Sequence, residues 1–207
     1  MSPTDTYHHA NLRKTLLDAA VILIGEAGPR AFTLREVARR AGVSHNAPYR
    51  HFASKDELLT AVALEGFDRL TGLMEETMAA GTSSLERLEL CGCGYVDFAM
   101  RWPNHLQVMF DLPLSQRACG ARIEPVGANC FQVLLDCITA AQKSGDLPAG
   151  DPLRMAWTAW SLVHGIAKLA ISGNLPLDAP ATIEFTRRAA KSICQGMARR
   201  ESGAQDG

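Results

Sequence analysis

The stretch that most limits how this chain can fold begins at residue 33, where helix-start signals flank a glycine turn. Thr33 and Glu36 have the spacing of a capping box, and an apolar face at three- and four-residue steps follows them. Gly42 can adopt a left-handed conformation at little cost, so the chain can turn sharply there. Ser44 is a suitable cap for a further helix. This succession predicts a helix-turn-helix.

Helical periodicity continues along the rest of the chain, with no strand pattern and no internal repeat. We predict an all-α fold, in which an N-terminal three-helix helix-turn-helix domain is joined by a linking helix to a larger helical ligand-binding and dimerisation domain. The predicted helices cover approximately residues 11–27, 33–41, 44–52, 54–79, 85–101, 103–110, 126–143, 151–171 and 179–200. The predicted domains are a disordered arm (1–10), the helix-turn-helix domain (11–56), the helical domain (57–200) and a disordered tail (201–207).

The charge of the chain is unevenly distributed although the net charge is only −1. Residues 1–55 hold eight basic and four acidic side chains, whereas the remainder holds thirteen basic and eighteen acidic ones. A basic end would steer that part of the molecule toward a polyphosphate such as DNA, although an uneven surface can also be without function. No apolar run is long enough to span a membrane and no secretory signal precedes the first helix, so we expect a cytoplasmic protein with reduced cysteines.

The side chains expected to contact DNA lie in and around the helix after the turn. His45, Asn46 and Ala47 occupy its first turn, where an amide can bond an adenine edge and a methyl group can contact thymine. Arg50 can reach a base or a phosphate, and hydroxyl, imidazole and ammonium donors suit phosphates. The expected DNA-contacting set is Thr33, Arg35, Ser44, His45, Asn46, Ala47, Tyr49, Arg50, His51 and Lys55. Taken singly, each could instead belong to an ordinary polar surface helix.

Residues 11–60 resemble the DNA-binding domain of the TetR family of bacterial transcription regulators. The resemblance is carried by Phe32-Thr33-Leu34-Arg35-Glu36-Val37-Ala38, Ala41-Gly42-Val43-Ser44, Tyr49-Arg50-His51-Phe52 and Ser54-Lys55-Asp56-Glu57-Leu58-Leu59. It implies a homodimer, a palindromic double-stranded DNA operator and, usually, repression that a small-molecule effector relieves. By matching position, Thr33, Tyr49, His51 and Lys55 look like the phosphate contacts of the family.

One segment departs from the family pattern. Asn46-Ala47-Pro48 stands where the family commonly has Gly-Thr-Leu or Gly-Ala-Leu. Proline has no N–H for the helix and disfavours the α conformation at the residue before it. We therefore expect the second helix of the motif to be kinked or to start late, which makes the base contacts of residues 45–47 the least secure.

The second half of the chain contains a motif of two tryptophans and a histidine. Trp160 and His164 are four residues apart and therefore share one face of a helix, and the segment resembles the Trp…His-Gly motif of a TetR subgroup. His164 is either a core histidine with a satisfied hydrogen bond or part of a ligand pocket. The residues expected to line a pocket for an apolar or aromatic effector are Tyr95, Phe98, Trp102, Met109, Phe110, Phe131, Trp157, Trp160 and His164. Aromatic and methionine side chains at helical spacing can equally be core.

Dimerisation is expected through the last two helices, which pair as a four-helix bundle in the family. The residues that would form the apolar stripe are Ile183, Ala190, Ile193 and Met197, with Leu153, Ala156 and Ala167 to match them. The alternative is that this stripe packs within one monomer.

No cofactor or metal ion is expected. Cys91 and Cys93 are two residues apart and point about 200° apart around a helix, so they cannot chelate one ion without unwinding it. Thiol sensing by Cys119, Cys130 or Cys137 stays open. No catalytic motif is present, so we expect no enzyme. The rival function is a small-molecule-binding helical protein with the same fold and weak or no operator recognition, for which Pro48 is the argument.

Overall fold

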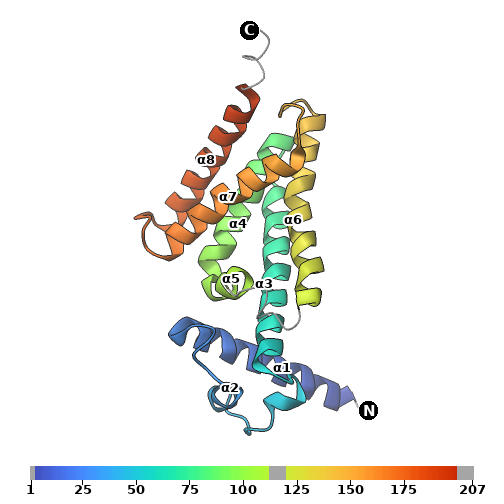
Figure 1. The fold of residues 1–207 in the computed structure, drawn as a ribbon, viewed down its shortest axis with the longest axis vertical. Helices are drawn as coiled ribbons and strands as arrows, with labels where there is room; N and C mark the ends of the chain where they lie inside the picture. Colours follow the sequence, from blue (N-terminus) through green and yellow to red (C-terminus); the bar gives the residue numbers. More distant parts are fainter. Residues whose placement is uncertain (1–2, 112–119, 200–207) are drawn as a thin grey trace. The chain divides into compact units, whose positions relative to one another are not determined.

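The computed structural model describes residues 3–111 and 120–199 of the 207-residue chain. All regular structure in these described ranges is helical, which confirms the predicted all-α fold (Figure 1). The helices are α1 (Pro3–Ala27), α2 (Leu34–Arg40), the 3-10 helix η1 (Pro48–Arg50), α3 (Lys55–Met78), α4 (Ser84–Arg101), α5 (Pro103–Phe110), α6 (Gly120–Lys143), α7 (Pro152–Ile171) and α8 (Ala179–Arg199).

Two helices begin earlier than the sequence predicts. Helix α1 starts at Pro3, so the backbone of residues 3–10, predicted to be a disordered arm, continues the first helix. Proline suits the first turn of a helix, and no glycine or further proline interrupts the chain before Gly25. Helix α6 starts at Gly120 rather than near residue 126 and contains Pro125. That proline lies near the helix start, where the missing N–H removes a single hydrogen bond. The predicted disordered tail lies outside the described residues.

The chain divides into two compact units. Unit 1 comprises residues 1–66 and 104–126 and contains α1, α2, η1, the first half of α3 and nearly all of α5. Its core is formed by fully buried side chains from successive helices, namely Leu16, Ile24, Val37, Phe52, Leu58, Val62 and Leu106. Helix α5 is fixed to α1 because the Asn104 amide donates a 3.0 Å hydrogen bond to the Val21 carbonyl.

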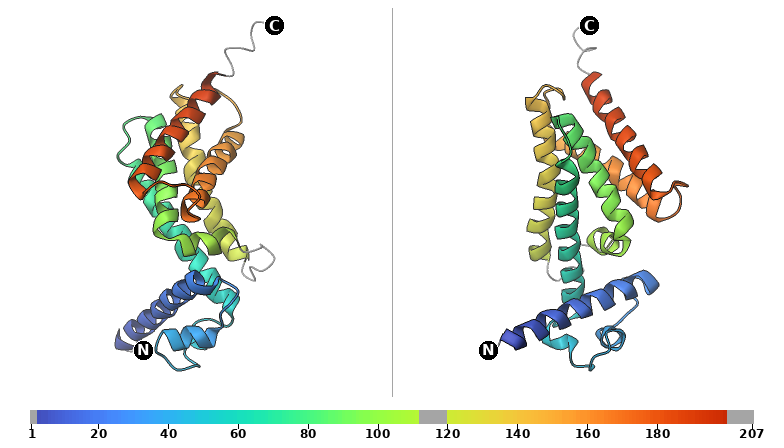
Figure 2. Two further views of the ribbon diagram at one scale, coloured as in Figure 1. Left: turned by 90° about the vertical axis from the view of Figure 1, so that its left-hand side faces the viewer. Right: turned by 180° about the vertical axis from the view of Figure 1, so that it is seen from behind.

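Unit 2 comprises residues 67–103 and 127–207. Within it, α3 and α6 run in the same direction, since Phe67 lies against Gly127 and Met78 lies against Cys137 (Figure 2). Helix α4 packs against both α7 and α8. It also approaches α3 closely at Gly94, where a Cβ atom would stand 2.9 Å from the backbone of Met74.

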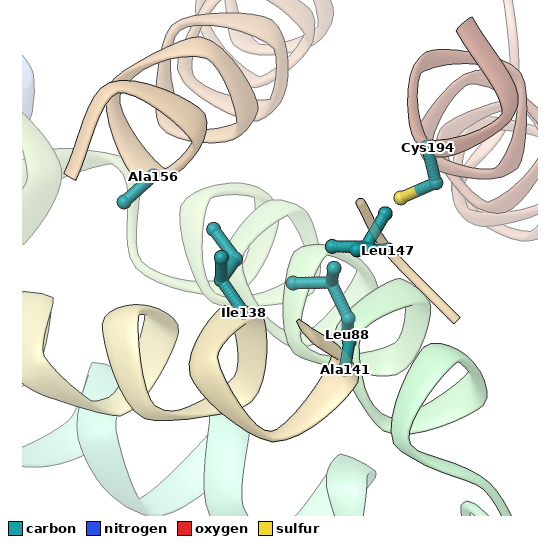
Figure 3. Close-up of a cluster of buried hydrophobic side chains, with 6 residues drawn as sticks. All are labelled: Leu88, Ile138, Ala141, Leu147, Ala156 and Cys194. Atoms are coloured by element: carbon teal, nitrogen blue, oxygen red, sulfur yellow. The ribbon is translucent and has the colours of Figure 1, made fainter. Parts of the chain in front are cut away.

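One hydrophobic cluster joins four of the helices of unit 2 and the segment after α6 (Figure 3). Its buried members are Leu88, Ile138, Ala141, Leu147, Ala156 and Cys194. These residues come from α4, α6, the segment after α6, α7 and α8, so the apolar faces of sequence-distant helices are buried together. The compact units do not follow the predicted boundary at residue 56, and the functional domain boundary stays a prediction.

Candidate nucleic-acid interface

Helix α2 and the turn after it are built by local hydrogen bonds. The Thr33 hydroxyl accepts from the Glu36 N–H, while the Glu36 carboxylate accepts from the Thr33 N–H at 2.7 Å, so the predicted capping box is present. At the other end, Val43 N–H donates to the Ala38 carbonyl and Gly42 N–H donates to the Arg39 carbonyl. This is a Schellman motif, and Gly42 adopts the required positive φ of 69°. The sharp turn predicted at Gly42 is therefore confirmed.

The segment after the turn is shorter and less helical than predicted. Only residues 48–50 form a helix, which is a 3-10 turn flanked by Ala47, and Ala47 makes no side-chain cap hydrogen bond. The prediction that Ser44 caps this helix is thus wrong, because the helix starts four residues later. Pro48 explains the shift, since proline favours a first-turn position and cannot serve inside an α-helix. The late start that we expected from Pro48 is confirmed.

Four side chains project from this segment into solvent. His45 and Asn46 lie on the turn, and Tyr49 and Arg50 lie on η1; all four are exposed, with Tyr49 51% accessible. Ala47 is only 8% exposed, so its predicted methyl contact with thymine is corrected: the methyl group packs inside unit 1. The exposed face carries an amide, a guanidinium, an imidazole and a phenol. These groups can donate hydrogen bonds to base edges and phosphates.

The remaining predicted DNA contacts surround this face. Arg35 and Ser44 are exposed and His51 is half-buried. The Lys55 ammonium donates to the Arg30 carbonyl at 2.8 Å and lies 4.5 Å from the centre of the Phe32 ring. Burial lowers the pKa of Lys55. That one bond uses one of three ammonium donors, so the side chain is held in place with donors remaining for an anion.

Thr33 is a predicted phosphate contact whose backbone N–H and hydroxyl already form hydrogen bonds within the chain. Its hydroxyl donates to the Glu36 carboxylate at 2.9 Å, and its hydrogen bonds to that carboxylate lower the pKa of Glu36. A phosphate at this helix start would have to compete with the carboxylate for the same donors.

A second group of predicted residues meets inside unit 2. The Tyr95 hydroxyl and His164 Nδ1 are 2.7 Å apart, and Trp160 also hydrogen-bonds to the Tyr95 hydroxyl. The ring of Trp160 contacts those of Phe131 and His164, with centroids 6.1 Å and 5.9 Å apart. Burial raises the pKa of Tyr95. Of the two interpretations of His164, the histidine with a satisfied hydrogen bond therefore agrees with the structure, and ligand contact stays a prediction.

The other predicted pocket residues are dispersed. Phe98 is fully buried and packs against Trp102, which lies under the Arg69 guanidinium. Trp157 is 52% exposed on α7, so it is not enclosed in the core of unit 2, and its contact with a ligand stays a prediction. Met109 and Phe110 belong to unit 1, whereas the aromatic cluster belongs to unit 2.

The thiols of Cys91 and Cys93 point in different directions from α4, as expected for two residues that lie two positions apart on a helix. The Cys93 thiol faces the Ile183 carbonyl on α8, whereas the Cys91 thiol faces Met74 on α3. In the part of the chain that the structure describes, no three His, Cys, Asp or Glu side chains converge as a metal site. Cys119 lies outside that part.

The fold and the exposed face after the Schellman turn define a helix-turn-helix protein with a second, larger helical unit. The family model of bacterial regulatory proteins of the tetR family matches residues 16–62, and that of the tetracyclin repressor-like C-terminal domain matches residues 88–192. The chain therefore belongs to the TetR family, as the sequence resemblance implied.

Individual relatives agree with this membership. The transcriptional repressor Rv3405c of Mycobacterium tuberculosis is 38% identical over an alignment of 154 residues, and the alignment covers 68% of this chain and 82% of that protein. The repressor KstR2 of Rhodococcus jostii is 40% identical over 86 residues, covering 41% of this chain and 42% of KstR2. The match covers 42% of KstR2 of Rhodococcus jostii and 52% of KstR2 of Mycolicibacterium smegmatis, so the chain spans about half the length of these relatives. These relatives are transcription regulators rather than enzymes.

A solved structure has the same fold over nearly the whole chain. It is a protein of unknown function from Rhodococcus sp. RHA1, with a TM-score of 0.79 and 31% identity, covering 96% of this chain and all of that one. Among the helices described for the present chain, none combines the length and the apolar character that crossing a membrane requires.

Proposed function

We propose that this chain is a DNA-binding transcription regulator that acts as a homodimeric repressor on a palindromic operator and is released by a small-molecule ligand. The observation that carries the proposal is the exposed face of His45, Asn46, Tyr49 and Arg50, which follows a Schellman turn within the region that matches the regulatory family. In a helix-turn-helix, this is the segment that reaches the major groove.

The proposed contacts fall into two classes. His45, Asn46 and Arg50 would bond base edges, because amide and guanidinium groups can make paired hydrogen bonds there. The side chains that would bond phosphates and set the position on the duplex are Thr33, Arg35, Ser44, Tyr49, His51 and Lys55. The excess of basic residues in residues 1–55 supports this division, since phosphate contacts supply most of the non-specific affinity.

A homodimer is supported by apolar side chains left exposed on the last two helices. These are Leu153, Trp157 and Leu169 on α7 and Phe185 on α8. Several residues of the stripe predicted from sequence pack within the monomer instead: Ala156, Ala167 and Ala190 are buried. The proposed dimer face is therefore the exposed set, and its two-fold symmetry would match two operator half-sites.

The proposed effector is apolar or aromatic and would bind beside the cluster of Tyr95, Phe131, Trp160 and His164. The rings of Phe131, Trp160 and His164 are only half-buried, so part of this aromatic surface is open to a ligand. Helix α3 belongs to both units and is the element that would carry the effect of the ligand toward the DNA-contacting face. Tryptophan fluorescence, compared between the parent chain and Trp160→Phe, would report binding beside this cluster.

A gel-shift titration against the DNA upstream of the gene tests the proposal. We expect the protein to shift one upstream fragment even when random duplex DNA is present in excess. The logarithm of the affinity should fall nearly linearly with the logarithm of the salt concentration. Arg50→Ala should weaken binding by about tenfold or more, because a charged hydrogen bond is lost. Arg154→Ala, which removes an exposed arginine of α7, is the matched control and should leave binding unchanged.

The rival function rests on the same segment. A 3-10 turn replaces the expected helix, so a helical small-molecule-binding protein with weak operator recognition remains the second candidate. Equal affinity for the upstream fragment and for random duplex, together with a ligand-induced change of tryptophan fluorescence that Trp160→Phe abolishes, would favour that candidate.

A further inference from the structure

An arginine of α1 lies on the residue that follows the candidate DNA-contacting segment. The Arg13 guanidinium carbon is 5.4 Å from the centre of the Phe52 ring. Phe52 comes directly after His51, and consecutive Cα atoms are about 3.8 Å apart, so α1 passes beside the end of that segment. Arg13 is exposed, whereas Phe52 is only 2% exposed. The guanidinium therefore covers the ring and itself stays in contact with solvent.

This contact with a ring leaves the hydrogen-bond donors of the guanidinium unused. An aromatic ring attracts the cation through the negative charge of its face, and no N–H group has to point at a single acceptor. Arginine carries five N–H donors in one plane, in a fork that matches two oxygens of a phosphate. A guanidinium that lies over a ring can therefore present its edge to an anion without giving up the ring.

Other basic side chains of unit 1 already face carboxylates. Lys14 forms an ion pair with Asp18 at 3.1 Å, and Arg40 forms one with Glu26. Each would have to exchange its carboxylate for a phosphate, so each gains less from DNA. Among the side chains that the structure describes, no carboxylate forms an ion pair with Arg13. A phosphate bound by Arg13 would therefore be a gain without a matching loss.

We propose that Arg13 is a further phosphate contact, through which α1 holds the DNA backbone beside the segment 45–51. The inference rests on the proposed DNA binding. Duplex DNA carries one negative charge for about every 1.7 Å of its axis, so a cation beside a base-contacting segment has phosphates within reach. The Phe52 ring holds the guanidinium in place, which reduces the side-chain entropy lost on binding. The contact sets the position of the protein on the duplex and carries no sequence preference.

The test compares Arg13→Ala with Lys14→Ala by fluorescence anisotropy of two labelled duplexes, the DNA upstream of the gene and a random sequence of equal length. Each variant removes one positive charge from an exposed position of α1, so both change the long-range field alike. Arg13→Ala should weaken binding to both duplexes by about tenfold, because a charge-assisted hydrogen bond is lost. It should also reduce the slope of log affinity against log salt by about 0.9 for each chain bound. Lys14→Ala should stay within about twofold of the parent chain, with an unchanged slope.

The salt slope separates a phosphate contact from an arginine that only covers Phe52. A purely structural role would lower the Tm and leave the slope unchanged, so thermal unfolding is measured on each variant. Arg13→Lys keeps the charge but lacks the fork, and it should retain the slope while losing part of the affinity. An unchanged slope in Arg13→Ala, or equal effects of Arg13→Ala and Lys14→Ala, would overturn the proposal. A parent chain that binds neither duplex would instead refute the proposed DNA binding itself.

Discussion

Replacing Tyr95 by phenylalanine removes one buried hydroxyl and nothing else. That hydroxyl hydrogen-bonds to His164 Nδ1 at 2.7 Å and is also bonded to Trp160. Tyr95 is 5% exposed, so water cannot replace the lost partner. Leaving buried polar groups unsatisfied costs about 1–3 kcal/mol, and we expect Tyr95→Phe to lower the free energy of unfolding by about 2 kcal/mol. For a chain of this length, that corresponds to a fall in Tm of about 4–8 °C.

A double-mutant cycle separates this hydrogen bond from general packing. Urea unfolding is measured for Tyr95→Phe, for His164→Leu and for the double variant. The double variant should be more stable than the sum of the single effects predicts, by about 1 kcal/mol or more, because both polar partners are then gone. Additivity within about 0.3 kcal/mol would refute the reasoning. Tyr49→Phe is the matched control: it makes the same chemical change at an exposed site and should alter stability by less than about 0.5 kcal/mol.

Three further predictions concern the surface of the chain. Tyr49→Ala should weaken binding to operator and random duplex alike by about tenfold in fluorescence anisotropy, and a changed sequence preference would contradict a phosphate contact. Trp157→Glu should dissociate the dimer in analytical ultracentrifugation, whereas Ile22→Glu, at a similarly exposed apolar site of unit 1, should not. Hydrogen bonds from the Thr82 N–H and hydroxyl lower the pKa of Glu86 below 4.5, so their stabilisation is present above that pH and is lost as the pH falls through the lowered pKa. Glu86→Gln should therefore reduce the fall of Tm that accompanies acidification below about pH 4.5.

Features that depend on neighbouring residues could be predicted from the sequence. The capping box of Thr33 and Glu36 is set by residues three apart, and the turn at Gly42 needs only a glycine that tolerates positive φ. Apart from the segment 44–52, in which only residues 48–50 are helical, the predicted helices are present in the described part of the chain.

Features that depend on distant residues could not be predicted. Periodicity places Trp157 and Trp160 on the same helix, but it cannot tell that Trp160 meets Phe131 from α6 while Trp157 faces outward. The same limit applies to Cys91: its spacing from Cys93 shows that the two thiols diverge, but it does not show that the Cys91 thiol contacts Met74 on α3. Side-chain convergence across helices is set by packing, which a single sequence does not encode locally.

Pro48 shows how one local rule changes what the DNA-contacting segment can do. With Pro48 at its first position, the expected helix is reduced to one 3-10 turn that carries Tyr49 and Arg50. His45 and Asn46 then project from a turn, and their direction is set by the Schellman motif before them and by the burial of Ala47 and Pro48 beside them. Burial of Ala47 and Pro48 within unit 1 thus replaces helical hydrogen bonds as the constraint on the directions of His45 and Asn46. If this segment contacts base edges as proposed, sequence specificity should therefore be sensitive to the volume of the residue at position 47, even though the Ala47 side chain is buried.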